Sequence, residues 1–167
     1  MTEPDFSLYR TLLSAQDWRT TGSFLSPEKA QWLLHQGSLT KKLYETGAQL
    51  SVKVIFQGWV QKNDQKPTAL SEKSVWRREV MLQGDGKNWI FARTDLPEST
   101  VRQVAGEVLY LGERPIGLWL FPQNPTRVSL QWRQDPTSGL YARRSDLLLK
   151  GYPIEIKELF LTDFIFQ

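Results

Sequence analysis

The last apolar stretch of the chain carries a carboxylate where an apolar side chain is expected. Residues 154–160 alternate as a half-buried β-strand does, and Glu158 falls on the apolar face. The same face carries Ile154, Ile156 and Phe160. An unpaired charge buried there costs several kcal/mol, roughly. The alternation therefore predicts a sheet whose buried face holds either a partner for Glu158 or a polar cavity.

A cation interrupts the alternation of residues 75–82 in the same way. Arg78 lies on the face that also carries Trp76, Val80 and Leu82. A buried cation and a buried carboxylate suggest a pocket for a small anion that has a second polar end. Two structural explanations for these charges are alternatives to the ligand pocket. Arg78 and Glu158 could form a salt bridge with each other, or a register shifted by one residue could turn both side chains outward.

Six strands are expected, and hairpins join most of them. The hairpin signal is strongest at 83–87, where Gly84-Asp85-Gly86 separates two alternating stretches. A polar loop is expected at 61–74 and a turn at 151–153. The expected strands are 49–60, 75–82, 88–95, 127–133, 140–150 and 154–161.

Helices are expected before and between these strands. Ser26 can cap a helix that Gly37 ends, and Ser38 can cap a second helix that runs to Gly47. Further helical segments are expected at 99–111 and 115–121. Strands joined mostly by hairpins, with three or four helices, indicate a single α+β domain over residues 1–167 with a mostly antiparallel sheet.

Composition excludes several kinds of chemistry. The 167 residues include no cysteine and one histidine, His35, so a disulfide or a cysteine nucleophile is impossible and a zinc site or a Ser-His-Asp triad is disfavoured. No Gly-rich phosphate loop stands at a strand-to-helix junction. No metal and no cofactor are therefore expected. An enzyme that works by charge, hydrogen bonds and shape remains, or a binding module without chemistry.

The charge pattern favours a small anionic ligand over a macromolecule. The net charge is +3, and the basic residues are scattered. The helical pair at 26–47 has the shape of a DNA-reading motif, but Lys41-Lys42 is its only basic cluster, so no nucleic-acid partner is expected. No apolar stretch approaches the roughly 18 residues of a membrane span, and no signal peptide is expected from the acidic N-terminus. A cytoplasmic monomer is expected.

Seven segments match a known family in order and spacing. They are Trp32-Leu33-Leu34, Ser38-Leu39-Thr40-Lys41, Trp76-Arg77-Arg78-Glu79-Val80, Ala92-Arg93-Thr94, Leu111-Gly112-Glu113-Arg114-Pro115-Ile116-Gly117, Tyr141-Ala142-Arg143-Arg144-Ser145 and Glu158-Leu159-Phe160-Leu161. With these segments the chain resembles bacterial chorismate lyase from about residue 28 to the C-terminus. The resemblance implies a six-stranded antiparallel sheet with flanking helices. It also implies conversion of chorismate to 4-hydroxybenzoate and pyruvate without a cofactor, the first step towards the ubiquinone head group.

The resemblance also implies roles for individual residues. Arg78 and the backbone amides of Leu39 and Ile116 are expected to hold the ring carboxylate of substrate and product. The family often has methionine at the position of Leu39, which matters little for a backbone contact. Glu158 is expected at the hydroxyl end of the ring, either as a general base or only to orient the ring. Arg93 is expected near the enolpyruvyl carboxylate, so Glu158 and Arg93 are the expected catalytic residues.

The helical segments at 26–47 and 99–121 are expected to act as two lids over the bound product. Their alternative role is simply to cover the core. The alternative function is a sensor domain of the same fold that binds a small aromatic acid without turnover. Such sensors are normally fused to a DNA-binding domain.

Overall fold

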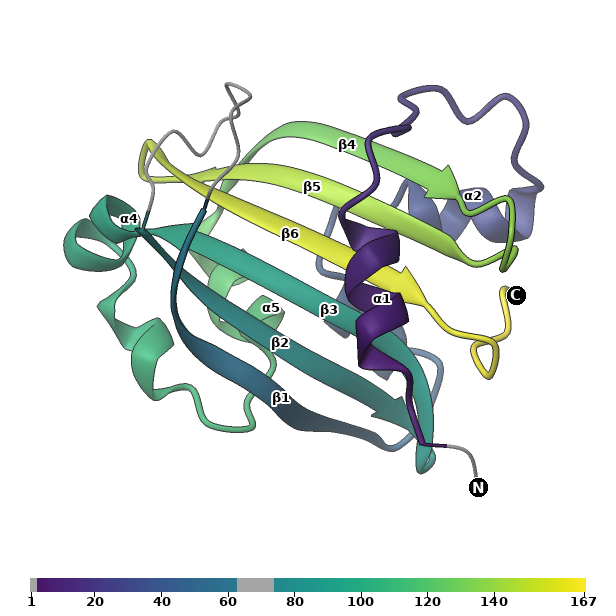
Figure 1. Ribbon diagram of the computed structural model, residues 1–167, viewed down its shortest axis with the longest axis horizontal. Helices are drawn as coiled ribbons and strands as arrows, with labels where there is room; N and C mark the ends of the chain where they lie inside the picture. The colour runs from purple at the N-terminus through teal and green to yellow at the C-terminus, as the bar shows by residue number, and fades with distance from the viewer. Residues whose placement is uncertain (1–2, 63–73) are drawn as a thin grey trace.

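The computed structural model describes residues 3–62 and 74–167, which fold around one six-stranded sheet (Figure 1). The strand order is β1-β2-β3-β6-β5-β4, and all five neighbouring pairs are antiparallel. The expected α+β class and strand count are confirmed, whereas residues 63–73 of the expected loop lie outside the described residues. The strands are β1 (Leu50–Gln61), β2 (Ser74–Gly84), β3 (Lys87–Pro97), β4 (Thr126–Gln134), β5 (Tyr141–Leu149) and β6 (Tyr152–Phe160).

Two tight hairpins fix the register of the central strands. Asp85 and Gly86 join β2 to β3 with φ of 51° and 80°, and the backbone of both residues is left-handed, as a two-residue type I′ turn requires. Lys150 and Gly151 join β5 to β6 in the same way, with φ of 51° and 88°. The second turn therefore lies one residue earlier than the sequence suggested.

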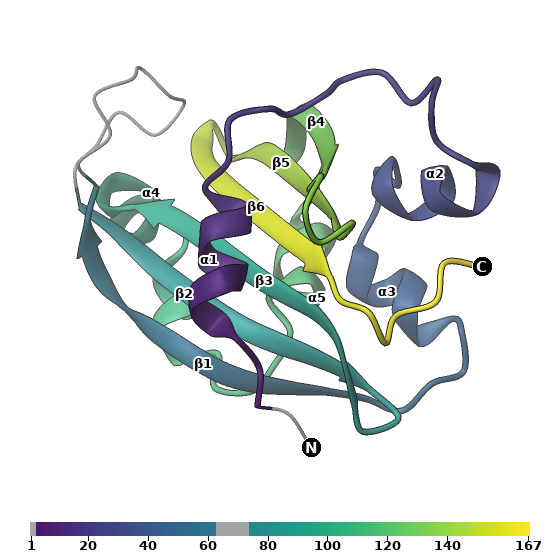
Figure 2. The same ribbon diagram turned by 45° about the vertical axis from the view of Figure 1, so that its right-hand side comes forward.

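Helices cover both faces of the sheet (Figures 1 and 2). Helix α1 (Phe6–Leu13) lies alone on one face, and the remaining helices lie on the other. Ser26 and Ser38 cap α2 and α3 as predicted, by accepting hydrogen bonds from the amides of Lys29 and Lys41. The remaining helices are α2 (Pro27–Leu33), α3 (Leu39–Tyr44), α4 (Glu98–Gln103), the 3-10 helix η1 (Gly106–Tyr110), α5 (Ile116–Leu120) and the 3-10 helix η2 (Phe121–Gln123).

The helix predicted over 99–111 is two helices. Val104 has φ of −138°, which lies outside the helical region, so α4 ends there and η1 starts two residues later. None of the described helices is long and apolar enough to cross a membrane.

Two core clusters lie under the helices α2 to α5, and they leave a polar seam between them. One cluster gathers around Leu33, Leu43 and Phe160, beneath α2 and α3. The other gathers around Leu96 and Leu120, beneath α4, η1 and α5. A third cluster, with Leu13 and Phe91, lies between the sheet and α1. The functional site described next lies at the seam.

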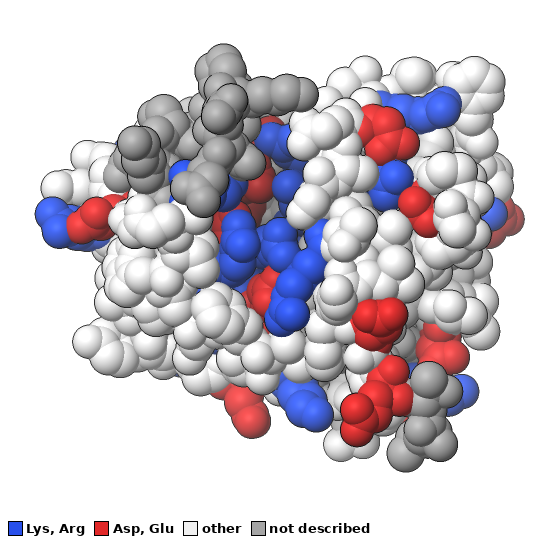
Figure 3. Space-filling view, viewed as in Figure 1, with Lys and Arg blue, Asp and Glu red and all other residues white. Residues whose placement is uncertain are grey.

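The face that carries α1 also holds many charges, which gather in a hollow of the surface (Figure 3). Asp95 pairs with Arg77 and Lys62, and Glu155 pairs with Lys62, Arg144 and Lys157. Each of these carboxylates is buried and therefore needs such partners. This ionic network is separated from the seam by the thickness of the sheet.

Candidate active site

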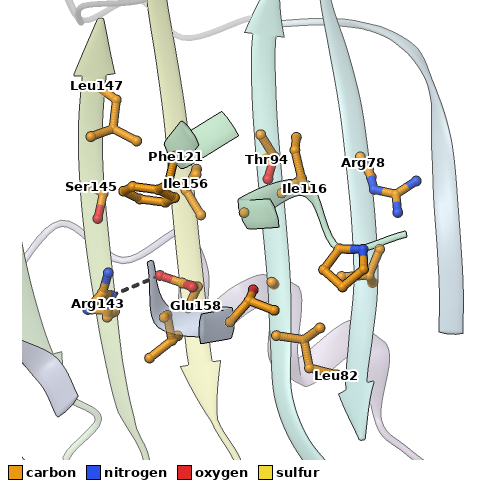
Figure 4. A pocket seen from close by; sticks show the side chains of 16 residues that line it. Arg78, Leu82, Thr94, Ile116, Phe121, Arg143, Ser145, Leu147, Ile156 and Glu158 are labelled. Carbon is orange, nitrogen blue, oxygen red and sulfur yellow. Dashed lines mark hydrogen bonds and ion pairs between the residues drawn. The ribbon is translucent and has the colours of Figure 1, made fainter. Parts of the chain in front are cut away.

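A cavity opens at the seam between the two helix-side clusters. It encloses about 580 Å³ of atom-free space, part of which is open to solvent. Its floor is the sheet, and α3 and α5 form its roof with Leu39, Thr40, Ile116 and Gly117. Figure 4 shows the labelled polar side chains on strands beneath the roof, with Arg78 at one side and Glu158 with Arg143 at the other.

Strand register places the polar residues of the floor in two neighbouring rows. Arg78, Thr94 and Ser145 belong to one row, because Arg78 pairs with Thr94 while Thr94 and Ser145 both pair with Ile156. Glu158 belongs to the next row and pairs with Arg143. The side chains of one row point to the same side of the sheet.

Arg78 is a buried cation without a carboxylate partner among the described residues. Its side chain donates from Nη1 to Oε1 of Gln57 over 3.2 Å and from Nη2 to the carbonyl oxygen of Arg114 over 2.9 Å. Its Nε is buried and has no protein acceptor in the described part of the chain. Burial lowers the pKa of Arg78. A buried guanidinium bound only to neutral oxygens is suited to an anionic ligand.

Glu158 is buried as predicted, and its partner is Arg143. The Nε of Arg143 donates to Oε1 of Glu158 over 2.8 Å, and the two residues are 2% and 7% exposed. This pair excludes both structural explanations raised by the sequence, since Glu158 does not bind Arg78 and neither side chain points outward. Arg143 also donates from Nη1 to the carbonyl oxygens of Trp32 and His35, at the end of α2.

A second arginine stands beside Arg143. Arg127 on β4 donates to Oγ of Ser145 over 2.8 Å and to the carbonyl oxygen of Gln36 over 2.8 Å. Burial, and then the charge of Arg143, lower the pKa of Arg127 to about 10, although Glu158 acts in the opposite direction. Arg127 and Arg143 together hold the carbonyl end of α2 against the sheet.

Leu39 and Ile116 lie at the cavity as the resemblance implied. Each is the first residue of its helix, α3 and α5, so its amide has no acceptor within the helix. The carbonyl oxygen of Arg114, two residues before Ile116, accepts a bond from Arg78. The arrangement therefore brings Arg78 close to the start of α5.

The expected position of Arg93 is wrong. Arg93 and Phe91 lie on the same face of β3, and this face is the one covered by α1. There the side chain of Arg93 donates from Nε and Nη2 to Oε2 of Glu79, over 3.0 and 2.8 Å. Because adjacent strand residues point to opposite sides, Thr94 and not Arg93 reaches the cavity.

Sequence reasoning missed Arg143, Ser145 and Thr94 as residues of the cavity. The sequence does contain a pattern that indicates the first two. Arg143 and Ser145 lie on the same strand face as Leu147 and Leu149, just as Arg78 lies on the face of its apolar neighbours. The partner of Glu158, by contrast, depends on which strand lies beside β6.

The described residues include no group of three or more histidine, cysteine or acidic side chains that could hold a metal ion. The cavity instead offers a cation at one side and a carboxylate at the other, between apolar walls. Such a site can bind a planar organic acid that carries a hydroxyl group at its far end.

Relatives with curated functions match most of the chain. A family model described as Chorismate lyase matches residues 12–167. The chorismate pyruvate-lyase of Escherichia coli O1:K1 is 36% identical over an alignment of 155 residues, and the match covers 90% of this chain and 93% of that protein. The chorismate pyruvate-lyase of Enterobacter sp. (strain 638) is 36% identical over an alignment of 141 residues, and the match covers 82% of this chain and 84% of that protein.

Solved structures of regulators share the fold. The effector domain of PhnF from Mycobacterium smegmatis has a TM-score of 0.52 at 14% identity and covers 76% of this chain and 90% of that one. The ligand-binding domain of a putative GntR-family transcriptional regulator from Bordetella bronchiseptica has a TM-score of 0.52 at 17% identity, with 72% and 90% covered. At such identities the likeness concerns the fold alone.

Proposed function

The chain belongs to the chorismate lyase family, and we propose that its cavity eliminates pyruvate from chorismate and leaves 4-hydroxybenzoate. The observation that carries the proposal is the buried Arg78, which has only neutral partners among the described residues and faces a cavity with Glu158 at its far side. A ring acid with an oxygen opposite its carboxylate fits between these two charges.

The spacing of the two residues suits one aromatic ring. Arg78 and Glu158 lie two strands apart and in neighbouring rows. Neighbouring rows on one face are two residues apart along a strand. With strands about 4.8 Å apart and residues about 3.4 Å apart along a strand, the Cα atoms of Arg78 and Glu158 are roughly 12 Å apart. Two inward side chains leave room in that span for a ring that carries a carboxylate and a hydroxyl group.

We assign the ring carboxylate to Arg78 and to the amides of Leu39 and Ile116. A guanidinium supplies directional, charged donors, and the two amides are free of intrahelical bonds. Glu158 then faces the hydroxyl group on C4. Its Oε1 is held by Arg143, so Oε2 is left to accept a bond from that hydroxyl group.

The reaction breaks the ether bond at C3 and removes the hydrogen from C4, and the ring becomes aromatic. The enolpyruvyl group leaves as pyruvate after its methylene carbon gains a proton. No redox step and no hydrolysis are involved, so the chain need only hold the reactive conformer in a site that excludes water. Glu158 either orients the ring or takes the C4 proton as a general base.

Deuterium at C4 of chorismate separates these two roles. We expect the label to appear in the methyl group of pyruvate, because the carboxylate of Glu158 is already committed to Arg143 and the hydroxyl group. Complete loss of deuterium to solvent, measured by NMR of the pyruvate formed, would instead assign Glu158 as the general base.

The roof of the cavity gives the product a route out. We propose that the segments 26–47 and 99–121 act as lids, since α3 and α5 pack against each other directly over the ring position. Opening requires that α3 and α5 separate and that the segments give up their bonds to the sheet, which Arg78 donates to Arg114 and which Arg127 and Arg143 donate to the end of α2. The sheet with Arg78 and Glu158 would stay in place, so the site would be ready for the next substrate.

The cellular setting is part of the proposal. 4-Hydroxybenzoate supplies the aromatic ring of ubiquinone, so we place the protein at the first step of that pathway, in the cytoplasm. We expect a monomer, because the exposed large apolar side chains of the described residues, such as Phe24, Trp59 and Tyr110, are dispersed over separate elements. Light scattering at micromolar concentration tests this expectation.

A direct assay tests the proposed function. Purified protein is treated with a chelator and given chorismate, and the ultraviolet spectrum is followed for 4-hydroxybenzoate. We expect product without added metal or nucleotide. Tight binding of 4-hydroxybenzoate with no turnover would contradict the proposal and indicate the sensor function instead.

A further inference from the structure

The β4–β5 side of the cavity carries more positive charge than its carboxylate neutralises. The charged residues that line the cavity are Arg78, Arg143 and Glu158. Arg127 does not line it but donates a hydrogen bond to Ser145, which does. Three cations and one anion leave a net charge of +2. Arg78 supplies one of these two positive charges at the β2 side of the cavity. Arg127, Arg143 and Glu158 together leave the second positive charge at the β4–β5 side.

Donors are also left free on that side. Nη2 of Arg143 has no protein acceptor among the described residues, whereas its Nε and Nη1 are both used. Ser145 lines the cavity, and its Oγ accepts a bond from Arg127. The hydroxyl hydrogen of Ser145 is therefore available to a second acceptor, because a hydroxyl group can accept and donate at once.

These observations matter because chorismate is a dianion. Its second carboxylate sits on the enolpyruvyl group, which is joined to C3, next to the C4 hydroxyl group. A ring whose hydroxyl group reaches Glu158 therefore carries its second carboxylate close to the neighbour of Glu158, which is Arg143. Arg93, which the resemblance assigned to this carboxylate, lies on the opposite face of the sheet.

We propose that Arg143 and Ser145 bind the enolpyruvyl carboxylate of the substrate, with Arg127 as the residue that positions Ser145 and supplies the balancing charge. This assignment rests on the proposed lyase function. The two charges of the substrate then match the net charge of +2 at the cavity. An anion beside Arg127 and Arg143 also relieves their mutual repulsion, which acts together with burial, the larger cause, to lower the pKa of Arg127.

The assignment gives the site a way to distinguish substrate from product. 4-Hydroxybenzoate has one carboxylate, so only the Arg78 side holds it strongly. The β4–β5 side contributes to affinity only while the enolpyruvyl group is attached or pyruvate is still bound. Loss of Arg127 is therefore expected to affect the substrate and not the product.

Two ligands that the enzyme does not convert allow the contribution of the second carboxylate to binding to be measured without turnover. They are 3-(carboxymethoxy)-4-hydroxybenzoate, which has it, and 3-ethoxy-4-hydroxybenzoate, which has the same length of side arm without it. We expect calorimetry to show that the wild type binds the first about tenfold more tightly. Arg127→Gln should reduce this preference to about twofold, and Arg127→Lys should restore most of it because it keeps the charge.

Kinetics supply the second measurement. Arg127→Gln should raise the KM for chorismate about tenfold and leave the affinity for 4-hydroxybenzoate within about twofold. The matched control is Arg133→Gln, on the same strand, because Arg133 donates to Asp17 and to the carbonyl oxygen of Leu12 and lies away from the cavity. This control should keep both the KM and the ligand preference.

The outcomes separate the two proposals. An unchanged ligand preference in Arg127→Gln, or equal weakening of both ligands, would overturn the second-carboxylate site, even with an active wild type. A wild type that prefers the dicarboxylate but never converts chorismate would leave this site standing and refute the lyase function.

Discussion

Arg143 and Glu158 face each other from the adjacent strands β5 and β6, and 2.8 Å separate the donor Nε from the acceptor Oε1. The same guanidinium holds two carbonyl oxygens at the end of α2. One side chain thus links the carboxylate of the cavity to the helical pair that covers it. A buried charge pair of this kind is sensitive to removal of either partner, because the other charge is left unpaired.

Replacement of Glu158 by glutamine should remove most of the activity. Glu158→Gln keeps the shape but leaves Arg143 without a counter-charge and weakens the contact to the C4 hydroxyl group. We expect kcat to fall about a hundredfold, as is typical when one electrostatic contact to the reacting group is lost. Glu155→Gln on the same strand, whose carboxylate lies in the ionic network of the α1 face, is the control and should retain a kcat close to that of the wild type. A Glu158→Gln variant with full activity would contradict the assigned role.

Removal of the Arg78 side chain should weaken product binding. Arg78→Ala deletes the charged donors to the ring carboxylate, and we expect the Kd for 4-hydroxybenzoate to rise at least about tenfold, as a lost charge-assisted hydrogen bond implies. Arg77→Ala is the matched control, because Arg77 is the adjacent residue and pairs with Asp95 on the other face. Calorimetry measures the Kd for 4-hydroxybenzoate in both variants. Equal affinities of the two variants would exclude the contact between Arg78 and the carboxylate.

The contact between α3 and α5, the two proposed lids, can be tested at Gly117. A Cβ atom at this position would lie 3.0 Å from Oγ1 of Thr40 and 3.3 Å from Oγ of Ser38, which is closer than ordinary packing. Gly117→Ala should therefore push α5 away from α3 and raise the dissociation rate of 4-hydroxybenzoate several-fold, which stopped-flow fluorescence can follow. Gly58→Ala, whose Cβ would meet only Phe56 at 3.5 Å, should leave the rate unchanged.

Arg93 should contribute to stability and not to catalysis. Arg93→Gln removes one of the two cations that pair with the buried Glu79, and the other, Arg10, is partly exposed. We expect a loss of about 3 kcal/mol in the free energy of unfolding, measured in urea. The KM for chorismate should stay close to the wild-type value. A large rise in the KM of Arg93→Gln with unchanged stability would instead support a role of Arg93 in substrate binding.

Acid should weaken the fold partly through Asp95. Burial raises the pKa of Asp95, but the hydrogen bonds and charge of Arg77, with Lys62, outweigh burial and hold the pKa below its ordinary value of 3.8. A carboxyl with a lowered pKa stabilises the fold above its unfolded pKa, and that stability is lost as the pH falls through the folded pKa. The relevant window therefore lies below about pH 4.

Asp95→Asn tests this contribution. The amide keeps the size but carries no charge, so we expect a loss of about 2 kcal/mol at pH 7. Unfolding in urea between pH 7 and pH 2 should show a shallower decline for the variant than for the wild type. Parallel declines would show that other carboxyl groups dominate the acid sensitivity.

Much of the fold could be predicted because it is recorded in local patterns. The alternation of residues 75–82 and 154–160 indicates both strands, and it is enough to place Arg78 and Glu158 on the same faces as their apolar neighbours. Ser26 and Ser38 mark the helix starts, and Asp85-Gly86 marks the first hairpin. These features depend on backbone preferences and side-chain direction within a few residues.

The sequence by itself therefore determined which residues form strands and which charges share an apolar face. The tertiary structure alone decided which face of the sheet encloses the cavity, and so assigned Arg93 to Glu79 and Arg143 to Glu158. The reason is that alternation gives two faces without saying which one the helices enclose. Pairs such as Arg143 with Glu158 depend on strand order, which is fixed by how the whole sheet packs and not by any local stretch.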